Sequence, residues 1–273
     1  METVEWARMT APELKERAEA GALVVLPVAS LEQHGPHLPT MVDTRLATEV
    51  SIRAATILAR SEPVVVLPCQ WMGLSEHHFP FGGTISLDVP TFHAVLQSIC
   101  RSLKADGFRR LFIVNGHGGN TEPLAVSVRE LAHEFGMAVV GGTYWLIAAE
   151  AITPLLATQT TVRHACEAET SMMLATEPGL VRRGQIEAAA RGLAAVADGT
   201  RAGDGPGVSR FRSFAERAPG TGVIGDPRAA SPEKGEALLA AIAARLAAVM
   251  ADPALWTVPD AVWEPGRAFG STG

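Results

Sequence analysis

Paired cysteines, basic clusters and long apolar runs are scarce in this chain, and each shortage excludes a class of protein. No stretch approaches the roughly 20 apolar residues that a membrane-spanning helix needs, so we expect no membrane partner. The net charge is −6 and no lysine or arginine run could follow a phosphate backbone, so we expect no nucleic-acid partner. Three cysteines, none in a Cys-x-x-Cys pair, offer neither an even disulfide framework nor a thiolate zinc site.

The unpaired cysteines, with an acidic N-terminal start where a signal peptide is basic, predict a protein of the reducing cytoplasm. What the chain does have is an ordinary globular composition, with 47% hydrophobic and 19% charged residues. Its 273 residues fit one α/β domain or two small ones, and we expect a single domain over residues 1–273.

Short apolar runs alternate with helical patterns over residues 22–150. The runs 64–67 and 111–114 are apolar at every position, as in parallel strands that are buried on both faces. Strands separated by helices predict βαβ crossovers and therefore a parallel sheet. We expect strands at 22–28, 64–68, 110–114 and 137–142, and helices at 44–60, 90–105, 121–135 and 232–250. Residues 186–222, rich in Gly, Ala and Arg, predict a loose excursion from the domain.

Three clusters of carboxylates and imidazoles follow predicted strands or open predicted helices. They are Glu32, His34 and Asp43; then His117; and last His164 with Glu169. In parallel sheets, ligands bind at the carboxyl ends of the strands, which is where the first two clusters fall. Carboxylate oxygen together with imidazole nitrogen suits divalent ions such as Zn²⁺ or Mn²⁺. The three clusters together therefore predict a metal site.

Each of these residues, taken alone, has a simpler explanation. Asp43 could be the N-terminal cap of the helix that follows it. His117 could be a structural residue of its loop, and Glu169 could lie on a solvated helix face. The glycines on both sides of His117, however, remove side chains around one imidazole and leave room for a ligand. The joint pattern favours the metal site.

Other residues are candidates for substrate contact. His77 and His78 follow the second strand, and adjacent residues of an extended chain face opposite ways, so we expect at most one of them, His78, inside. Trp145 could stack on a flat or cyclic substrate, although a tryptophan packed in the core is an equal alternative. Gly118 and Gly119 are further candidates for substrate contact in the loop after His117.

Several motifs resemble those of the creatininase (creatinine amidohydrolase) family of metal-dependent hydrolases. They are SLEQHGPHLPTMVDT at 30–44, NGHGGN at 115–120 and ETS at 169–171, with weaker matches at 81–87 and 222–227. The resemblance implies a three-layer α/β/α fold with a mostly parallel central sheet. It also implies a two-metal site, hydrolysis by metal-activated water, and a homohexamer.

Residue roles can be carried over onto the matching positions. The resemblance implies that Glu32 and His117 bind one divalent ion. His34 would bind the other ion, and Asp43 would bridge the two. Because the family's ions are divalent, Zn, Mn or Fe are the candidates at two ions per chain.

The chain departs from creatininase at Gly119, where creatininase has a glutamate that binds the second ion. Glu169 is then the candidate to complete that ion and to take part in catalysis. His164 matches the histidine that creatininase places beside its substrate, and it is the candidate general acid. The loss of a carboxylate at Gly119 argues against creatinine as the substrate.

The sequence therefore predicts an enzyme, namely a metal-dependent amidohydrolase that cleaves a C–N bond in a small cyclic amide or formamide. Peptide cleavage and cyclic-ketone (C–C) hydrolysis within the same family are alternatives, as is a non-catalytic metal-binding protein. A nucleotide-binding module is disfavoured because the run 115–120 matches neither the GxGxxG nor the Walker pattern.

Overall fold

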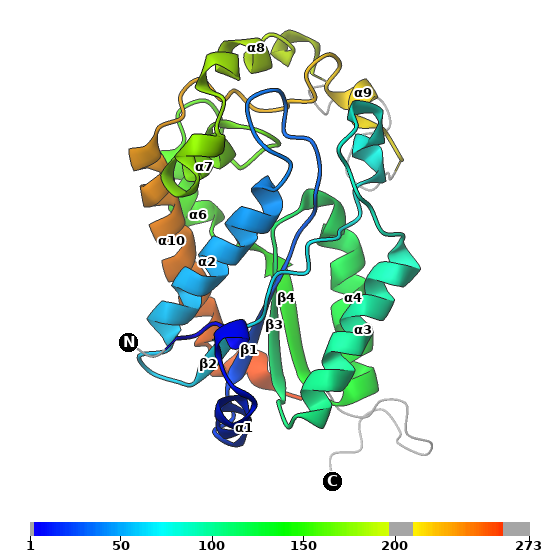
Figure 1. Cartoon of the computed structure of the whole chain (residues 1–273), viewed down its shortest axis with the longest axis vertical. Coiled ribbons are helices and arrows are strands. Elements are labelled where there is room, and N and C mark those ends of the chain that lie inside the picture. Colours follow the sequence, from blue (N-terminus) through cyan, green and yellow to red (C-terminus); the bar gives the residue numbers. More distant parts are fainter. Residues whose placement is uncertain (1–2, 197–209, 259–273) are drawn as a thin grey trace.

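The computed structural model describes residues 3–196 and 210–258, and its centre is a sheet of four parallel strands (Figure 1). The strands are β1 (Leu23–Val28), β2 (Val64–Val66), β3 (Arg110–Asn115) and β4 (Ala138–Thr143). Their order in the sheet is β2-β1-β3-β4, and every neighbouring pair is parallel. The expected strands are all present, with small differences at their ends.

Long helices cover both faces of this sheet, which gives three layers (Figure 1). One face is covered by α2 (Val42–Leu58), α7 (Glu167–Thr176) and α10 (Pro232–Met250). The other is covered by α3 (Val89–Ala105) and α4 (Thr121–Phe135). The bounds of α4 and α10 agree with the expected ones at both ends, whereas α2 begins at Val42 and not at residue 44.

Successive residues of β1 belong to two different hydrophobic cores. Leu23 and Val25 pack with the α2, α7 and α10 side, and Val24 and Leu26 pack with the α3 and α4 side. Because side chains alternate along a strand, a sheet covered on both faces needs an apolar residue at every position. Each fully buried side chain of this size contributes roughly 1.5–3 kcal/mol of stability.

The remaining helices are shorter and connect or cover these layers. They are η1 (Trp6–Arg8), α1 (Ala11–Glu19), η2 (Glu76–Phe81), η3 (Gly118–Asn120), α5 (Tyr144–Ile147), α6 (Ala149–Ile152), η4 (Thr153–Leu155), η5 (Pro178–Leu180), η6 (Arg183–Gln185), α8 (Ile186–Ala190), η7 (Leu193–Ala195), α9 (Phe214–Arg217) and η8 (Pro253–Trp256). The predicted excursion at 186–222 contains α8, η7 and α9, and its residues 197–209 lie outside the described residues. Among the helices of the described ranges, none is long and apolar enough to cross a membrane.

Candidate metal centre

The predicted metal ligands meet in one cluster and are almost completely buried. They are Glu32, His34, Asp43, His117 and Glu169, each at most 5% exposed. β1 and β3 are neighbours in the sheet, so the segments that follow them leave it at the same edge. The first turns of α2 and α7 supply the other two carboxylates.

The carboxylate of Asp43 lies between two imidazoles. Its Oδ1 is 3.1 Å from Nε2 of His34, and its Oδ2 is 3.0 Å from Nδ1 of His117. Asp43 does not cap α2, because the residue that precedes the helix is Met41 and no side chain caps it. The simpler explanation of Asp43 is therefore wrong. A carboxylate that presents one oxygen to each of two imidazoles has the geometry of a bridging ligand.

His117 turns its Nδ1 toward the carboxylates. Its Nε2 lies 3.1 Å from the backbone oxygen of Leu74, which can only accept, so the proton of the neutral ring is on Nε2. Nδ1 of the neutral ring would then offer its lone pair to a metal ion, and it lies 3.1 Å from Oε2 of Glu32 and 3.0 Å from Oδ2 of Asp43. A backbone carbonyl that fixes the ring in this way is typical of metal-binding histidines.

His34 turns its Nε2 toward the carboxylates of the cluster. Its Nδ1 is 3.2 Å from the backbone oxygen of Glu32 and donates to it, which leaves the lone pair on Nε2. This buried Nε2 has no hydrogen-bond partner, although Oδ1 of Asp43 is 3.1 Å away and Oε1 of Glu169 is 4.0 Å away. Beside two carboxylates this nitrogen needs a cation, which is a proton when no ion is bound and a divalent metal ion when one is, and the donor set fits such an ion.

A strained turn before α7 anchors Glu169. Ala165 has a φ of 56°, in the left-handed region, where a residue with a side chain costs roughly 1–2 kcal/mol. In this conformation the N–H of Ala165 donates to Oε2 of Glu169, while Oε1 remains on the side of His34. The strained backbone thus holds the carboxylate, and it also carries His164, the preceding residue.

The carboxylates change the proton affinity of the cluster. Burial lowers the pKa of His34, but the charges of Asp43, Glu169 and Glu32 outweigh it and raise that pKa to about 9. Burial also opposes the charges of Glu32 and Asp43 at His117, and the pKa of this ring is again well above its usual value. Burial raises the pKa of Glu169 to about 7, against the effect of the His34 ring. The cluster therefore attracts positive charge.

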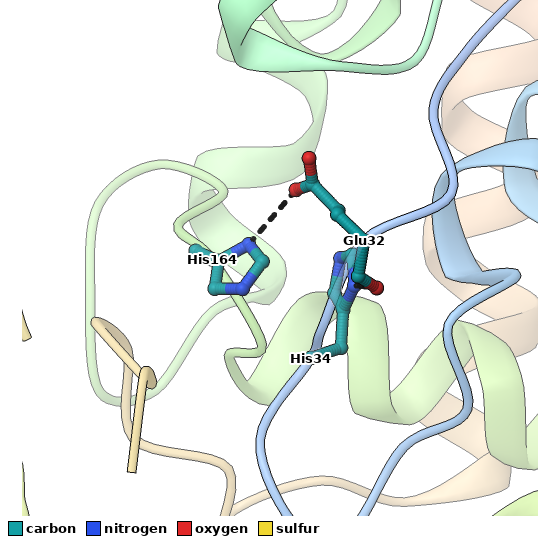
Figure 2. A group of neighbouring side chains, drawn as sticks. All are labelled: Glu32, His34 and His164. Carbon is teal, nitrogen blue, oxygen red and sulfur yellow. Dashed lines mark hydrogen bonds and ion pairs between the residues drawn. The ribbon is translucent and has the colours of Figure 1, made fainter. Parts of the chain in front are cut away.

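Two further imidazoles contact the other oxygen of Glu32. Nε2 of His78 is 3.2 Å from Oε1 of Glu32. Nδ1 of His164 is 3.5 Å from the same oxygen, and Figure 2 shows the His164 ring facing Glu32 beside His34. Burial, together with the neighbouring imidazoles, lowers the pKa of both His78 and His164, so both rings are neutral near pH 7.

Both His77 and His78 reach the cluster, so the expectation that at most one of them would is wrong. They lie in η2, a 3₁₀ helix, where neighbouring side chains are about 120° apart, and not in an extended segment. His77 forms a possible ligand group with Glu32 and His117, in which one ligand atom from each residue lies within 4.8 Å of the others.

Three more side chains of the site were not expected from the sequence: Gln33, Ser75 and Phe214. The hydroxyl of Ser75 donates to Oε2 of Glu32 at 2.7 Å. Nε2 of Gln33 lies 3.0 Å from a ring nitrogen of each of His78 and His164. The ring of Phe214 stacks on His78 with centroids 3.8 Å apart. Gln33 lies between two predicted ligands and Ser75 lies two residues before His77, so their positions in the sequence are a signal. Phe214 is not near any predicted site residue in the sequence, and no motif marks it.

The other predicted substrate contacts have different surroundings. A Cβ at Gly118 would meet no atom within 4 Å, whereas one at Gly119 would lie 2.3 Å from the backbone oxygen of Leu74 and 2.5 Å from Nε2 of His117. This backbone therefore has no room for a glutamate at Gly119. Trp145 is half-buried against the core and contacts Tyr144, and its role in substrate binding stays a prediction.

The family model described as creatininase (creatinine amidohydrolase) matches residues 7–250. The chain belongs to the creatininase family. Its relatives include the mycofactocin precursor peptide peptidase of Mycobacterium ulcerans (strain Agy99), 33% identical over 89% of this chain and 86% of that protein. The creatinine amidohydrolase of Pseudomonas putida is 32% identical over 85% of this chain and 90% of its own length.

Solved creatininase structures have the same fold. The crystal structure of a creatinine amidohydrolase superposes with a TM-score of 0.72 at 31% identity, and the match covers 92% of this chain and 97% of that one. A structure described as "Creatininase Mn" has a TM-score of 0.71 at 30% identity, with 91% and 98% covered. These comparisons confirm the three-layer α/β/α fold and the predicted family. The chain is a creatininase-family hydrolase that carries groups of metal-ligand side chains.

Proposed function

We propose that this hydrolase is an amidohydrolase that cleaves a C–N bond in a small cyclic amide or formamide, with two divalent ions of Zn, Mn or Fe. The observation that carries the proposal is the position of Asp43, with one carboxylate oxygen toward His34 and the other toward His117. Glu32 lies on the His117 side and Glu169 on the His34 side. Each ion would therefore have one imidazole, one terminal carboxylate and the shared one.

The protein side chains supply the proton transfers. Divalent ions held by this cluster would supply an activated water and polarise the carbonyl group of a substrate. His164 is neutral and lies at the edge of the cluster, so it can accept a proton from the attacking water and deliver it to the leaving nitrogen. Burial raises the pKa of Glu169 to about 7, and a bound cation would hold this carboxylate in its ionised form as a ligand.

A cavity beside the cluster offers space for the substrate. Its volume is about 740 Å³, and its lining includes Gln33, Gly35, Phe81, Arg191 and Thr221. This size suits a small molecule or the end of a peptide. Because Gly119 replaces the glutamate of creatininase and no carboxylate fits there, we infer that creatinine is not the substrate.

Peptide cleavage is the second candidate. It is favoured by the similarity to mycofactocin precursor peptide peptidases and by a cavity that could admit a chain end. Cyclic-ketone hydrolysis and a non-catalytic metal-binding role are the further alternatives. A small-molecule substrate, a cytoplasmic location, a single domain and a homohexamer stay predictions from the sequence and the resemblance.

The test is a screen of metal-loaded protein against cyclic amides, formamides, short peptides, cyclic ketones and creatinine. We expect turnover of a cyclic amide or formamide that is abolished by a chelator and restored by added Zn²⁺ or Mn²⁺. Turnover of peptides alone would replace the first candidate with the second. If no substrate of any class is turned over by protein with a full metal complement, the hydrolytic proposal fails.

A further inference from the structure

The cavity beside the metal centre has one charged side chain in its wall. Among the described residues that line it, Arg191 is the only one with a charge, and none of them carries a carboxylate. Most of the other lining residues are apolar or glycine, and Pro36, Phe81 and Ala188 are among them. A cation attracts an anion, and apolar walls bury an apolar group attached to that anion. The cavity therefore has the chemistry of a binding site for an apolar acid.

The guanidinium of Arg191 is available to a ligand. Arg191 directly follows α8 and is exposed. Its guanidinium forms no hydrogen bond or ion pair within the described part of the chain, not even with Glu187 one turn earlier in α8. By contrast, Arg45, Arg53 and Arg228 are each paired with a carboxylate of the protein. A guanidinium matches the two oxygens of a carboxylate with two parallel hydrogen bonds.

Close packing connects the end of α8 with the metal centre. A Cβ at Gly192 would lie 2.6 Å from Oγ1 of Thr221. A Cβ at Gly222 would lie 2.6 Å from Oε1 of Gln33, so a side chain at either glycine would force one of these groups to move. Nε2 of Gln33 in turn lies 3.0 Å from Nε2 of His164. A continuous series of contacts therefore leads from the end of α8 to the proposed acid–base residue.

Thr221, which also lines the cavity, has a hydroxyl group without a partner. Its Oγ1 is buried and makes no hydrogen bond within the described residues. A buried hydroxyl without an acceptor is unfavourable, and a ligand oxygen that reaches it would supply the acceptor. A carboxylate has two oxygens with two lone pairs each, so it can accept from a guanidinium and from a hydroxyl at the same time.

We propose that Arg191 is a specificity-determining residue, which binds a carboxylate of the substrate while the scissile amide lies at the metal centre. The placement of the amide rests on the proposed amidohydrolase function, whereas the binding of an apolar carboxylate does not. N-formyl amino acids, lactam acids and the C-terminal ends of peptides all carry an amide a few bonds from a carboxylate. Gln33 lines the cavity and also contacts His164, so one such molecule can span both places.

Substrate pairs with and without the carboxylate test the proposal on the metal-loaded enzyme. N-formylleucine is compared with N-isoamylformamide, pyroglutamate with pyrrolidinone, and a tripeptide with its C-terminal amide. In the pair that the enzyme hydrolyses, we expect a KM about 10- to 100-fold lower for the acid, because a hydrogen bond to a charged group has this strength. The pair that is turned over also identifies the source of the carboxylate. Equal KM values within that pair would overturn the proposal.

Variants of Arg191 assign the preference to one side chain. In Arg191→Gln we expect the ratio of the two KM values to fall toward one. Arg191→Lys keeps the charge but not the fork of donors, so we expect an intermediate ratio. The matched control is Arg183→Gln, since Arg183 is an exposed arginine of η6 that is not among the described lining residues. A preference that survives Arg191→Gln but is lost in Arg217→Gln would assign the carboxylate to the arginine over the Phe214 ring, and the proposal would be wrong.

Binding without turnover separates this inference from the proposed function. Isocaproate and the neutral isohexanol contain no amide, and calorimetry measures their binding to the metal-loaded protein. We expect the acid to bind wild type about 10- to 100-fold more tightly than the alcohol, and this difference to shrink in Arg191→Gln. If it does but no amide is hydrolysed, Arg191 stands as the carboxylate-binding residue and the amidohydrolase proposal fails. If the acid binds wild type and Arg191→Gln equally, it contacts the metal ions or another cation, and the inference is wrong.

Discussion

Oδ2 of Asp43 lies 3.0 Å from Nδ1 of His117, although the two residues are 74 positions apart in the sequence. Asp43 stands in the first turn of α2, and His117 stands just after β3. A carboxylate in the first turn of a helix is stabilised by the helix dipole, which helps to keep Asp43 ionised in a buried place. The imidazoles of His34 and His117 lower its pKa further, against the effect of burial.

Native protein should contain close to two divalent transition-metal ions per chain. The five buried ligand side chains provide donors for two sites that share one carboxylate. Elemental analysis after gentle purification measures the content, and thermal unfolding with and without a chelator measures the stabilisation that ions binding the folded state provide. Less than half an ion per chain, with no activation by added Zn²⁺ or Mn²⁺, would contradict the prediction.

Asp43→Ala should remove both ions, whereas His34→Ala and Glu169→Ala should chiefly weaken one. A bridging ligand serves two ions, so its loss is the more severe. The measurement is metal content after dialysis against a weak chelator. The matched control is Asp88→Ala, because Asp88 is an aspartate that caps α3 by accepting from the N–H of Thr91. Full metal content in Asp43→Ala would mean that Asp43 is no bridge.

His164→Ala should lower turnover by about 10²–10⁴-fold, the usual range for loss of an acid–base group, with metal content unchanged. Nδ1 of His164 lies 3.5 Å from Oε1 of Glu32, and His164 is not one of the five proposed metal ligands. Steady-state kinetics and elemental analysis on the same samples test both halves. His93→Ala serves as the control, since His93 lies in α3 and bonds to Ser127. Unchanged turnover in His164→Ala would remove this histidine from the mechanism.

Gly119→Ala should reduce metal binding and stability, whereas the neighbouring Gly118→Ala should do neither. The added methyl group at Gly119 would lie within 2.5 Å of both the Leu74 backbone oxygen and Nε2 of His117, so a ligand must move. Overpacking of this kind lowers the free energy of unfolding by roughly 1–3 kcal/mol. A Cβ at Gly118 would meet no atom within 4 Å, so Gly118→Ala is the matched control. Thermal unfolding and metal titration of the pair decide the question, and equal behaviour would contradict the close packing at Gly119.

Glu49→Gln should lower the stability of the metal-free protein by about 1 kcal/mol at pH 7. Glu49 accepts from Arg45 and from Arg53 at 2.7 Å each, and these arginines lower its pKa although burial opposes them. Because the pKa of Glu49 is lower in the folded protein, its ion pairs add their full contribution to the free energy of unfolding above the unfolded-state pKa of 4.5. This contribution is lost as the pH falls through the lowered pKa of the folded state. Urea unfolding at pH 7 and below pH 4 measures the loss. A difference between wild type and variant that persists unchanged in acid would refute the ion-pair explanation.

The positions of most elements follow from local pattern. β1 and β3 are apolar at nearly every position because helices cover both faces of the sheet, and this property is visible in the sequence. Ser231 caps α10 through its bond to the N–H of Lys234, and Pro232 opens the helix, which is why this start could be predicted to the residue. The start of α2 was missed by two residues because no capping side chain marks it.

The sequence by itself determined which titratable side chains the candidate metal centre contains. The residue types Glu32, His34, Asp43, His117 and Glu169, placed after strands or at helix starts, were enough to expect a metal centre, since β1 and β3 carry two of the clusters to one sheet edge. Only the tertiary structure decided how these side chains face one another. The arrangement that joins Gln33 to His164 depends on a contact across 131 positions. Side-chain direction in irregular segments is set by long-range packing, and no periodicity in the sequence records it.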